Sequence, residues 1–224
     1  MNKTQAHNGE IVNVATHLTR MAREQPYKRA VVYPAGRDKY KRVTYAHLTF
    51  LQLEHEVDRL AHGLKKAGIT RQTKTVLMVR PSIEFFALIF AIFKTGAIPV
   101  VVDPGMGIRR MLSCYKSTRP EAFIGIPLAH VVRSLAPKFF STVKTWITVG
   151  RRWFWGGLTL DQIRRPDLEP FQTANTARDE TAAILFTTGS TGPAKGARYT
   201  HGNFDAQLQQ IKSHLNMAAD EIET

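Results

Sequence analysis

Short apolar runs and longer amphipathic stretches alternate through most of the chain. The apolar runs are rich in β-branched residues and bounded by turn residues, which predicts buried strands at 75–79, 98–102, 122–126, 145–149 and 181–187. The intervening stretches have helical periodicity, which predicts helices at 82–96, 108–117, 128–135 and 203–216. Strands that alternate with helices imply right-handed crossovers, so we expect an α/β fold with mainly parallel, doubly wound sheets and flanking helices.

The first third of the chain departs from this alternation. A helix is predicted over 11–25, ended by Pro26, and strands over 30–33 and 40–43 are expected to form a hairpin around Pro34–Gly36. Thr44 is the expected N-cap of the next helix. The apolar face of that helix would consist of Ala46, Phe50, Leu53, Val57, Leu60 and Leu64. Residues 158–179 are polar and contain prolines, so we expect a surface connection there.

The composition is typical of a globular protein, with 224 residues of which 43% are hydrophobic and 22% charged. The amino terminus lacks the apolar segment of a signal peptide. The apolar run at 85–93 is too short to cross a bilayer. Cys114 is the only cysteine, which excludes an internal disulfide and favours a reducing, cytoplasmic location.

The formal net charge of +13 is unevenly distributed. Residues 109–165 contain eleven Lys or Arg and two acids, Glu121 and Asp161, and so carry +9. No nucleic-acid-binding motif accompanies this charge, so nucleic acid is not the expected partner. Peripheral contact of this basic segment with an anionic membrane, or binding to an acidic partner, is equally compatible with the charge, especially at 151–155, where arginines adjoin aromatic residues. The alternative is a solvated basic surface whose aromatic side chains lie in the core.

The stretch TTGSTGPAKG, residues 187–196, follows the last predicted strand. Its glycines let the backbone approach a ligand, and its hydroxyls and lysine are donors suited to phosphate. The phosphate-binding candidates are Thr187, Thr188, Gly189, Ser190, Thr191, Gly192 and Lys195. The stretch is not a P-loop, because its lysine lies between Ala194 and Gly196, and it contains no GxGxxG dinucleotide motif.

Residues 187–196, followed by His-Gly-Asn at 201–203, resemble the phosphate-binding signature of the adenylate-forming (AMP-binding) enzymes, which include the acyl-CoA synthetases. Ala194 departs from the signature, since many members have proline there. Residues 43–48 and 59–64 look like the opening helix of that family, and Lys94–Val100 with the following Asp-Pro looks like its second core motif. Within the superfamily, the stretches 79–86, 102–107, 120–127 and 150–156 resemble the olefin β-lactone synthetases.

This resemblance implies ATP-dependent activation of a fatty carboxylate as an acyl-adenylate, and within the olefin β-lactone synthetases that carboxylate is a long-chain β-hydroxy acid. A β-lactone or an acyl thioester would follow, with release of AMP and pyrophosphate. ATP and Mg²⁺ are the implied cofactors, a fatty or β-hydroxy fatty acid is the substrate, and other proteins of an olefin pathway are implied partners. His201 is the one catalytic candidate, because a family histidine near this point lies toward the substrate channel. No residue is assigned to a metal.

The resemblance further implies that residues 1–224 form the N-terminal portion of an adenylation domain and lack its C-terminal lid domain. We therefore expect the chain to have little or no activity alone. Two alternatives stay open at this point: a non-catalytic nucleotide-binding module, and a basic membrane or nucleic-acid adaptor in which the glycine-rich loop is structural. Binding to anionic vesicles or DNA that survives a change at Lys195 would favour the adaptor.

Overall fold

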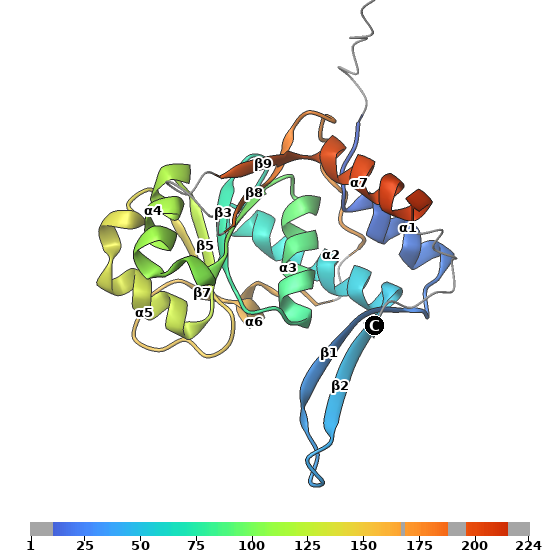
Figure 1. Cartoon of the computed structure of the whole chain (residues 1–224), viewed down its shortest axis with the longest axis horizontal. Coiled ribbons are helices and arrows are strands. Elements are labelled where there is room, and N and C mark those ends of the chain that lie inside the picture. Colours follow the sequence, from blue (N-terminus) through green and yellow to red (C-terminus); the bar gives the residue numbers. More distant parts are fainter. Residues whose placement is uncertain (1–10, 167–168, 188–195, 215–224) are drawn as a thin grey trace, which may run out of the picture.

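The computed structural model describes residues 11–166, 169–187 and 196–214 (Figure 1). The helices are α1 Thr16–Glu24, α2 Phe50–Lys66, α3 Ile83–Lys94, α4 Ile108–Thr118, α5 Pro127–Leu135, α6 Leu160–Ile163 and α7 His201–His214. The strands are β1 Arg29–Arg37, β2 Val43–Thr49, β3 Lys74–Met78, β4 Ile98–Val102, β5 Ala122–Gly125, β6 Thr145–Thr148, β7 Leu158–Thr159, β8 Thr181–Phe186 and β9 Ala197–Thr200. Short 3-10 turns occur at Pro104–Met106 and Pro137–Phe139.

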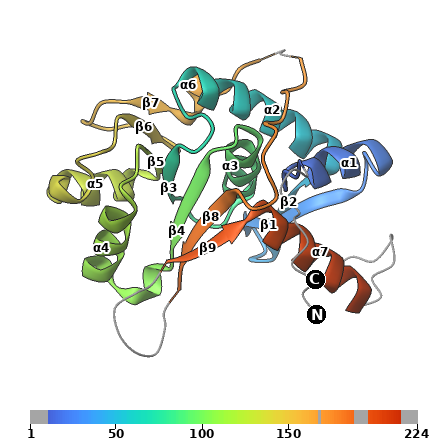
Figure 2. The same ribbon diagram turned by 90° about the horizontal axis from the view of Figure 1, so that it is seen from above.

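The described residues build a central seven-stranded sheet in the order β7-β6-β5-β3-β4-β8-β9 (Figure 2). Its described strand pairs are parallel except β8 and β9, which are antiparallel. The predicted strands at 75–79, 98–102, 122–126 and 145–149 are thus confirmed to within about a residue at each end. The prediction of a mainly parallel sheet with flanking helices is confirmed as well.

Both faces of this sheet are covered by helices. Successive residues of a strand point to opposite faces, so Leu77 and Ile124 pack against α2 and α3 on one side. Their neighbours Val76 and Phe123 pack against α4 and α5 on the other. Figure 2 shows these two helical layers on either side of the strands. The sheet therefore has an apolar core on each face, which explains why the central strands are apolar along their whole length.

The hairpin β1–β2 projects from the body of the molecule (Figure 1). Its strands pair from Arg29↔Thr49 out to Arg37↔Val43, so the turn lies at 38–42 and the expected turn at Pro34–Gly36 is wrong. Thr44 is likewise not an N-cap, because it lies inside β2.

The helix after the hairpin begins later than expected, because the antiparallel pairing holds residues 43–49 extended. Thr49 is its N-cap: the Thr49 hydroxyl accepts from the Gln52 amide at 3.3 Å, and the Gln52 side chain accepts from the Thr49 amide at 3.0 Å. Residues 43–48, which were expected to belong to the opening helix, therefore form a strand instead.

Part of the connection over 158–179 is buried, although its polar sequence predicted a surface segment. It contributes the edge strand β7 and the short helix α6, and the side chains of Ile163 and Phe171 join the core cluster under α2. No helix within the described residues is long and apolar enough to span a bilayer.

Candidate functional site

The strand order creates a topological switch point at the carboxyl ends of two neighbouring strands. The chain leaves β3 toward α3 on one face of the sheet, and it leaves the adjacent β4 toward α4 on the opposite face. In open α/β sheets ligands bind at this kind of switch point, outside the carboxyl ends of the strands. The strand β8 lies next to β4, so its carboxyl end borders the same switch point.

The glycine-rich stretch connects β8 to β9, and the sheet holds both of its ends. The pairing of Leu185 with Ala197 closes the connection at its base. Thr187 is exposed at the carboxyl end of β8. Gly196 lies against the aromatic ring of Phe186, and a β-carbon there would come within 2.7 Å of that ring. The absence of a side chain at Gly196 is thus required by packing at the base of the loop.

A backbone hydrogen bond joins the end of β8, directly before the glycine-rich stretch, to the turn after β4. The Asp103 amide donates to the Phe186 carbonyl at 2.9 Å, and the Asp103 carboxylate accepts from the Gly105 amide at 2.8 Å. The structure therefore places the Asp-Pro turn at 103–104 beside the residue from which the 187–196 stretch begins.

Positively charged residues follow the carboxyl ends of β3 and β4. Arg80 follows β3, and Arg109 and Arg110 occupy the first turn of α4; all three are exposed and form no ion pair with another described residue. The first turn of α4 contains no acidic residue. A helix amino end already carries partial positive charge, so two arginines there favour a bound anion. From the sequence alone, Arg109 and Arg110 count only as part of the basic segment 109–165, and Arg80 has no assigned role.

The structure tests the sequence-predicted loop residues only in part. Thr188, Gly189, Ser190, Thr191, Gly192 and Lys195 lie outside the described residues. Thr187 is described, and its exposed position at the end of β8 is compatible with phosphate binding. The role of the whole stretch remains a prediction.

His201 lies inside the molecule, with 1% of its surface exposed. Its Nδ1 accepts a hydrogen bond from the Val14 amide at 3.2 Å, and its ring makes an edge contact with Phe93. Burial lowers the pKa of His201 from 6.5 to about 4, so the ring is neutral at pH 7. These contacts give His201 a structural role in holding the segment before α1. Its catalytic role remains a prediction.

The two residues after His201 also have local roles. Gly202 donates its amide to the Arg178 carbonyl at 2.8 Å, and a β-carbon there would come within 2.5 Å of the Arg178 side chain. Asn203 forms a reciprocal cap with Thr200, with hydrogen bonds of 2.9 and 3.1 Å. The His-Gly-Asn motif thus fixes the start of α7 directly behind the glycine-rich stretch.

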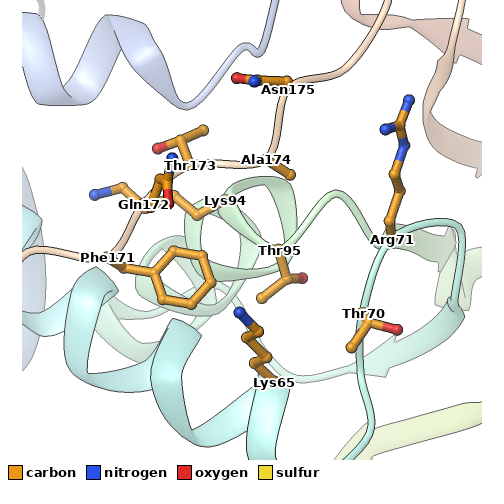
Figure 3. Close-up of a pocket in the computed structure, with 10 residues that line it drawn as sticks. All are labelled: Lys65, Thr70, Arg71, Lys94, Thr95, Phe171, Gln172, Thr173, Ala174 and Asn175. Atoms are coloured by element: carbon orange, nitrogen blue, oxygen red, sulfur yellow. The ribbon is translucent and has the colours of Figure 1, made fainter.

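A hollow of about 320 Å³ lies at the other end of the strands (Figure 3). Thr70 and Arg71 precede β3 and Thr95 precedes β4, so this hollow is at the amino ends of the strands. Figure 3 shows Lys65 pointing toward Phe171, whose ring centre is 5.8 Å from the ammonium group. Because the strand order directs ligands to the carboxyl ends, we do not assign the substrate site to this hollow.

Comparisons with known proteins agree with this geometry. A family model described as AMP-binding enzyme matches residues 18–222. The chain is 43% identical, over 92% of its length, to the olefin β-lactone synthetase of Xanthomonas campestris pv. campestris, and covers 37% of that protein. It is also 43% identical, over 94% of its length, to the olefin β-lactone synthetase of Stenotrophomonas maltophilia, and covers 39% of that protein. The chain therefore spans about two fifths of these curated relatives.

Solved structures show the same fold. The chain superimposes on a long-chain-fatty-acid-CoA ligase from Archaeoglobus fulgidus with a TM-score of 0.77 at 18% identity, covering 93% of this chain and 41% of the ligase. An anthranilate CoA ligase in complex with anthranoyl-AMP gives a TM-score of 0.73 at 20% identity, covering 90% of this chain and 37% of that structure. The described sheet and helices thus correspond to part of the adenylate-forming fold.

Proposed function

The chain belongs to the AMP-binding enzyme family of adenylate-forming ligases, and on this premise we propose that it binds the phosphates of ATP during the activation of a fatty carboxylate. The main support is the position of the two ends of the 187–196 stretch: the β8–β9 pairing brings them together, and the end of β8 lies beside the Asp103 turn at the carboxyl end of β4. The exposed arginines that follow β3 and begin α4 suit a polyanionic ligand.

In this reaction two anions have to meet. A carboxylate oxygen of the substrate forms a bond to the α-phosphorus of ATP, while the bond from that phosphorus to the oxygen bridging the β-phosphorus breaks. Pyrophosphate leaves with the electrons of that bond. We assign the hydroxyl of Thr187 and the donors of 188–195 to the β- and γ-phosphates, where they would neutralise and align the leaving group.

Mg²⁺, when bound with ATP, would screen the phosphate charge. Its oxygen ligands would come largely from the phosphates and water, as is common for this ion. Within the described ranges there is no group of three or more His, Cys, Asp or Glu side chains that could hold a metal, so we assign no described residue to Mg²⁺. Asp103 already accepts from the Gly105 amide and serves the turn after β4.

For the substrate we propose a long-chain β-hydroxy carboxylate. The support is the name shared by the two relatives at 43% identity, both olefin β-lactone synthetases. In the acyl-adenylate of such an acid, the β-hydroxyl oxygen can attack the activated carbonyl carbon. A four-membered lactone forms, AMP leaves, and the hydroxyl proton passes to a base.

Nucleotide binding tests the proposed site directly. We expect the chain to bind ATP with Mg²⁺ in isothermal titration calorimetry, and Lys195→Ala to weaken binding roughly tenfold to a hundredfold, because a charged hydrogen bond contributes about 1.5–3 kcal/mol. Lys212→Ala, which removes an exposed lysine of α7, is the matched control and should leave affinity unchanged. Equal affinity of the Lys195 variant and the wild type would contradict the assigned role of the loop.

Pyrophosphate exchange tests the chemistry separately from binding. We expect little exchange by the 224-residue chain with either plain or β-hydroxy fatty acids, because it spans about two fifths of its curated relatives. Robust exchange would refute this expected inactivity while supporting adenylation. Exchange that is faster with β-hydroxy acids would support the proposed substrate class, and exchange restricted to plain acids would reject it.

A further inference from the structure

The loop that joins β6 to β7, residues 149–157, has a fixed conformation. Trp155 is buried, stacks on the His130 ring with centroids 5.2 Å apart and planes 7° from parallel, and donates its indole N–H to the Thr148 hydroxyl at 3.0 Å. The Arg152 guanidinium donates to the Gly157 carbonyl across the loop. Gly157 has a φ of +100°, and a β-carbon there would collide with the backbone of β6.

Two large aromatic side chains on this anchored loop point into solvent. Trp153 is 57% exposed and Phe154 is 77% exposed, although the next residue, Trp155, is almost completely buried. Both rings contact the ring of Trp155, at centroid distances of 5.5 and 5.0 Å, yet more than half of each side chain stays open to solvent. Exposed neighbouring aromatics on a fixed loop are typical of a contact surface.

The helix beside the loop adds exposed apolar groups. Both figures show α5 next to the β6–β7 connection at the outer end of the sheet, and the stacking of Trp155 on His130 joins the two (Figures 1 and 2). Leu128 is 59% exposed and Leu135 is 81% exposed. They are seven positions apart and therefore share one side of α5, while His130 faces the sheet.

The surroundings of these apolar groups are basic. Arg151 and Arg152 are exposed and make no ion pair with other described residues, and the whole segment 109–165 carries +9. Aromatic rings at headgroup depth, aliphatic side chains and flanking arginines are the combination that binds an anionic bilayer surface. A nucleic acid would use the arginines and aromatics but would gain nothing from exposed leucines.

We propose that the loop 151–154 and the outer side of α5 form a docking surface for an anionic lipid membrane. Trp153 and Phe154 insert at the level of the headgroups, and Arg151 and Arg152 pair with lipid phosphates. This surface shares no residue with the proposed nucleotide site, so each can fail without the other.

Vesicle binding tests the proposal. In co-sedimentation with vesicles of phosphatidylcholine containing phosphatidylglycerol, we expect the chain to bind, and to bind vesicles of phosphatidylcholine alone much more weakly. Arg151→Gln should weaken binding roughly fivefold, and Trp153→Ser with Phe154→Ser roughly tenfold or more, since each basic or apolar group contributes separately at such a surface. The matched controls are Lys39→Gln and Tyr40→Ser on the exposed hairpin, which should change binding less than about twofold.

Tryptophan fluorescence distinguishes insertion of side chains into the bilayer from electrostatic binding at its surface. Trp153 is the exposed member of the three tryptophans, Trp155 is buried and Trp146 is half-buried. We expect brominated lipids to quench the emission of the wild type, and this quenching to be largely lost in Trp153→Phe while vesicle binding persists.

Four results would overturn the proposal. The first is equal binding to both kinds of vesicle, and the second is binding that the Arg151 and Trp153/Phe154 variants leave unchanged. The third is binding to a single-stranded oligonucleotide that these variants abolish, with no binding to vesicles. The fourth is self-association that is lost in the Trp153/Phe154 variant, because it would identify a second copy of the chain as the occupant.

Discussion

At the scale of single residues, a buried ion cluster ties α2 to α3. The Lys94 ammonium, 1% exposed, donates to Glu54 at 2.7 Å and to Asp58 at 2.5 Å. Two acidic groups around one cation leave the cluster with a formal charge of −1. The cluster is stable only while its members remain together, because a buried charge without a partner is costly.

Removing the Lys94 ammonium should therefore destabilise the fold far more than removing an exposed lysine. Lys94→Met is expected to lower the free energy of unfolding by about 3–5 kcal/mol, because it leaves two buried carboxylates without their partner. Urea denaturation measures the loss. Lys66→Met, at an exposed position of α2, is the control and should change stability by less than about 0.5 kcal/mol. A loss at Lys94 as small as at Lys66 would show that the cluster does not stabilise the fold.

The buried histidines give the fold a predictable pH dependence. Burial lowers the pKa of both His201 and His130 from 6.5 to about 4, so the unfolded chain binds protons between these values that the folded chain does not. Their contribution to the free energy of unfolding is complete above pH 6.5 and is lost as the pH falls toward 4. Between pH 7.5 and pH 5, each histidine should lower the free energy of unfolding by about 1–2 kcal/mol.

A variant at His201 tests this assignment. His201→Gln should be less stable than the wild type at pH 7.5, since it disturbs the bond from Val14, but it should lose less stability on acidification. Urea unfolding at pH 7.5 and pH 5 measures both quantities. If the variant and the wild type lost equal stability between these pH values, protonation of His201 would not be the cause.

At the scale of elements, the packing of α6 on α2 depends on one glycine. A β-carbon on Gly63 would lie 1.8 Å from the Ile163 carbonyl oxygen, which belongs to backbone and cannot turn away. Helix propensity alone predicts that alanine at this position of α2 stabilises the helix by about 1 kcal/mol. The clash of the alanine β-carbon with the Ile163 carbonyl oxygen costs more free energy than this gain in helix propensity.

Gly63→Ala is accordingly expected to destabilise the chain by about 2 kcal/mol or more, because α6 has to move away from α2. Thermal unfolding followed by circular dichroism would report the loss. His55→Ala, on the exposed side of the same helix, provides the comparison and should be neutral or slightly stabilising. A stabilised Gly63 variant would mean that propensity outweighs the contact.

At the scale of the whole molecule, the segment before α1 connects parts that are far apart in the sequence. The buried Asn13 side chain donates to the Phe93 carbonyl at 2.9 Å and to the Ala174 carbonyl at 3.1 Å. Next to it, the Val12 amide donates to the Thr176 carbonyl at 2.9 Å. One short segment thus joins the end of α3 to the extended chain that leads into β8.

Asn13→Ala should remove the side-chain hydrogen bonds that connect these segments. The Ala174 carbonyl and the buried Ala15 amide lose their partner, while the Phe93 carbonyl keeps the Gly96 amide, so a loss of about 2–4 kcal/mol is expected in denaturant unfolding. Hydrogen exchange should increase most at residues 174–177. Asn175→Ala removes an exposed asparagine within the same segment and serves as the control. Unchanged exchange in the Asn13 variant would show that the segment is not needed to hold the strand β8 in place.

Much of the fold could be predicted because it depends on consecutive residues. The apolar runs predicted the central strands, and the helix predicted from residue 82 does begin there, with the Ser82 hydroxyl accepting from the Phe85 amide at 3.2 Å. The 187–196 stretch indicated the family by its residue types and spacing, and the family model confirms that assignment. Periodicity, capping and motif spacing are local properties, so the sequence contains them directly.

Only the tertiary structure decided which elements meet. The start of α2 moved from Thr44 to Thr49 because β1 pairs with residues 43–49, and no local signal in that stretch reports its partner. In the same way, the contacts of His130 and Thr148 determine that Trp155 turns inward and leaves Trp153 exposed. The physical reason is that burial depends on partners distant in sequence, so the same residue type is core in one context and surface in another.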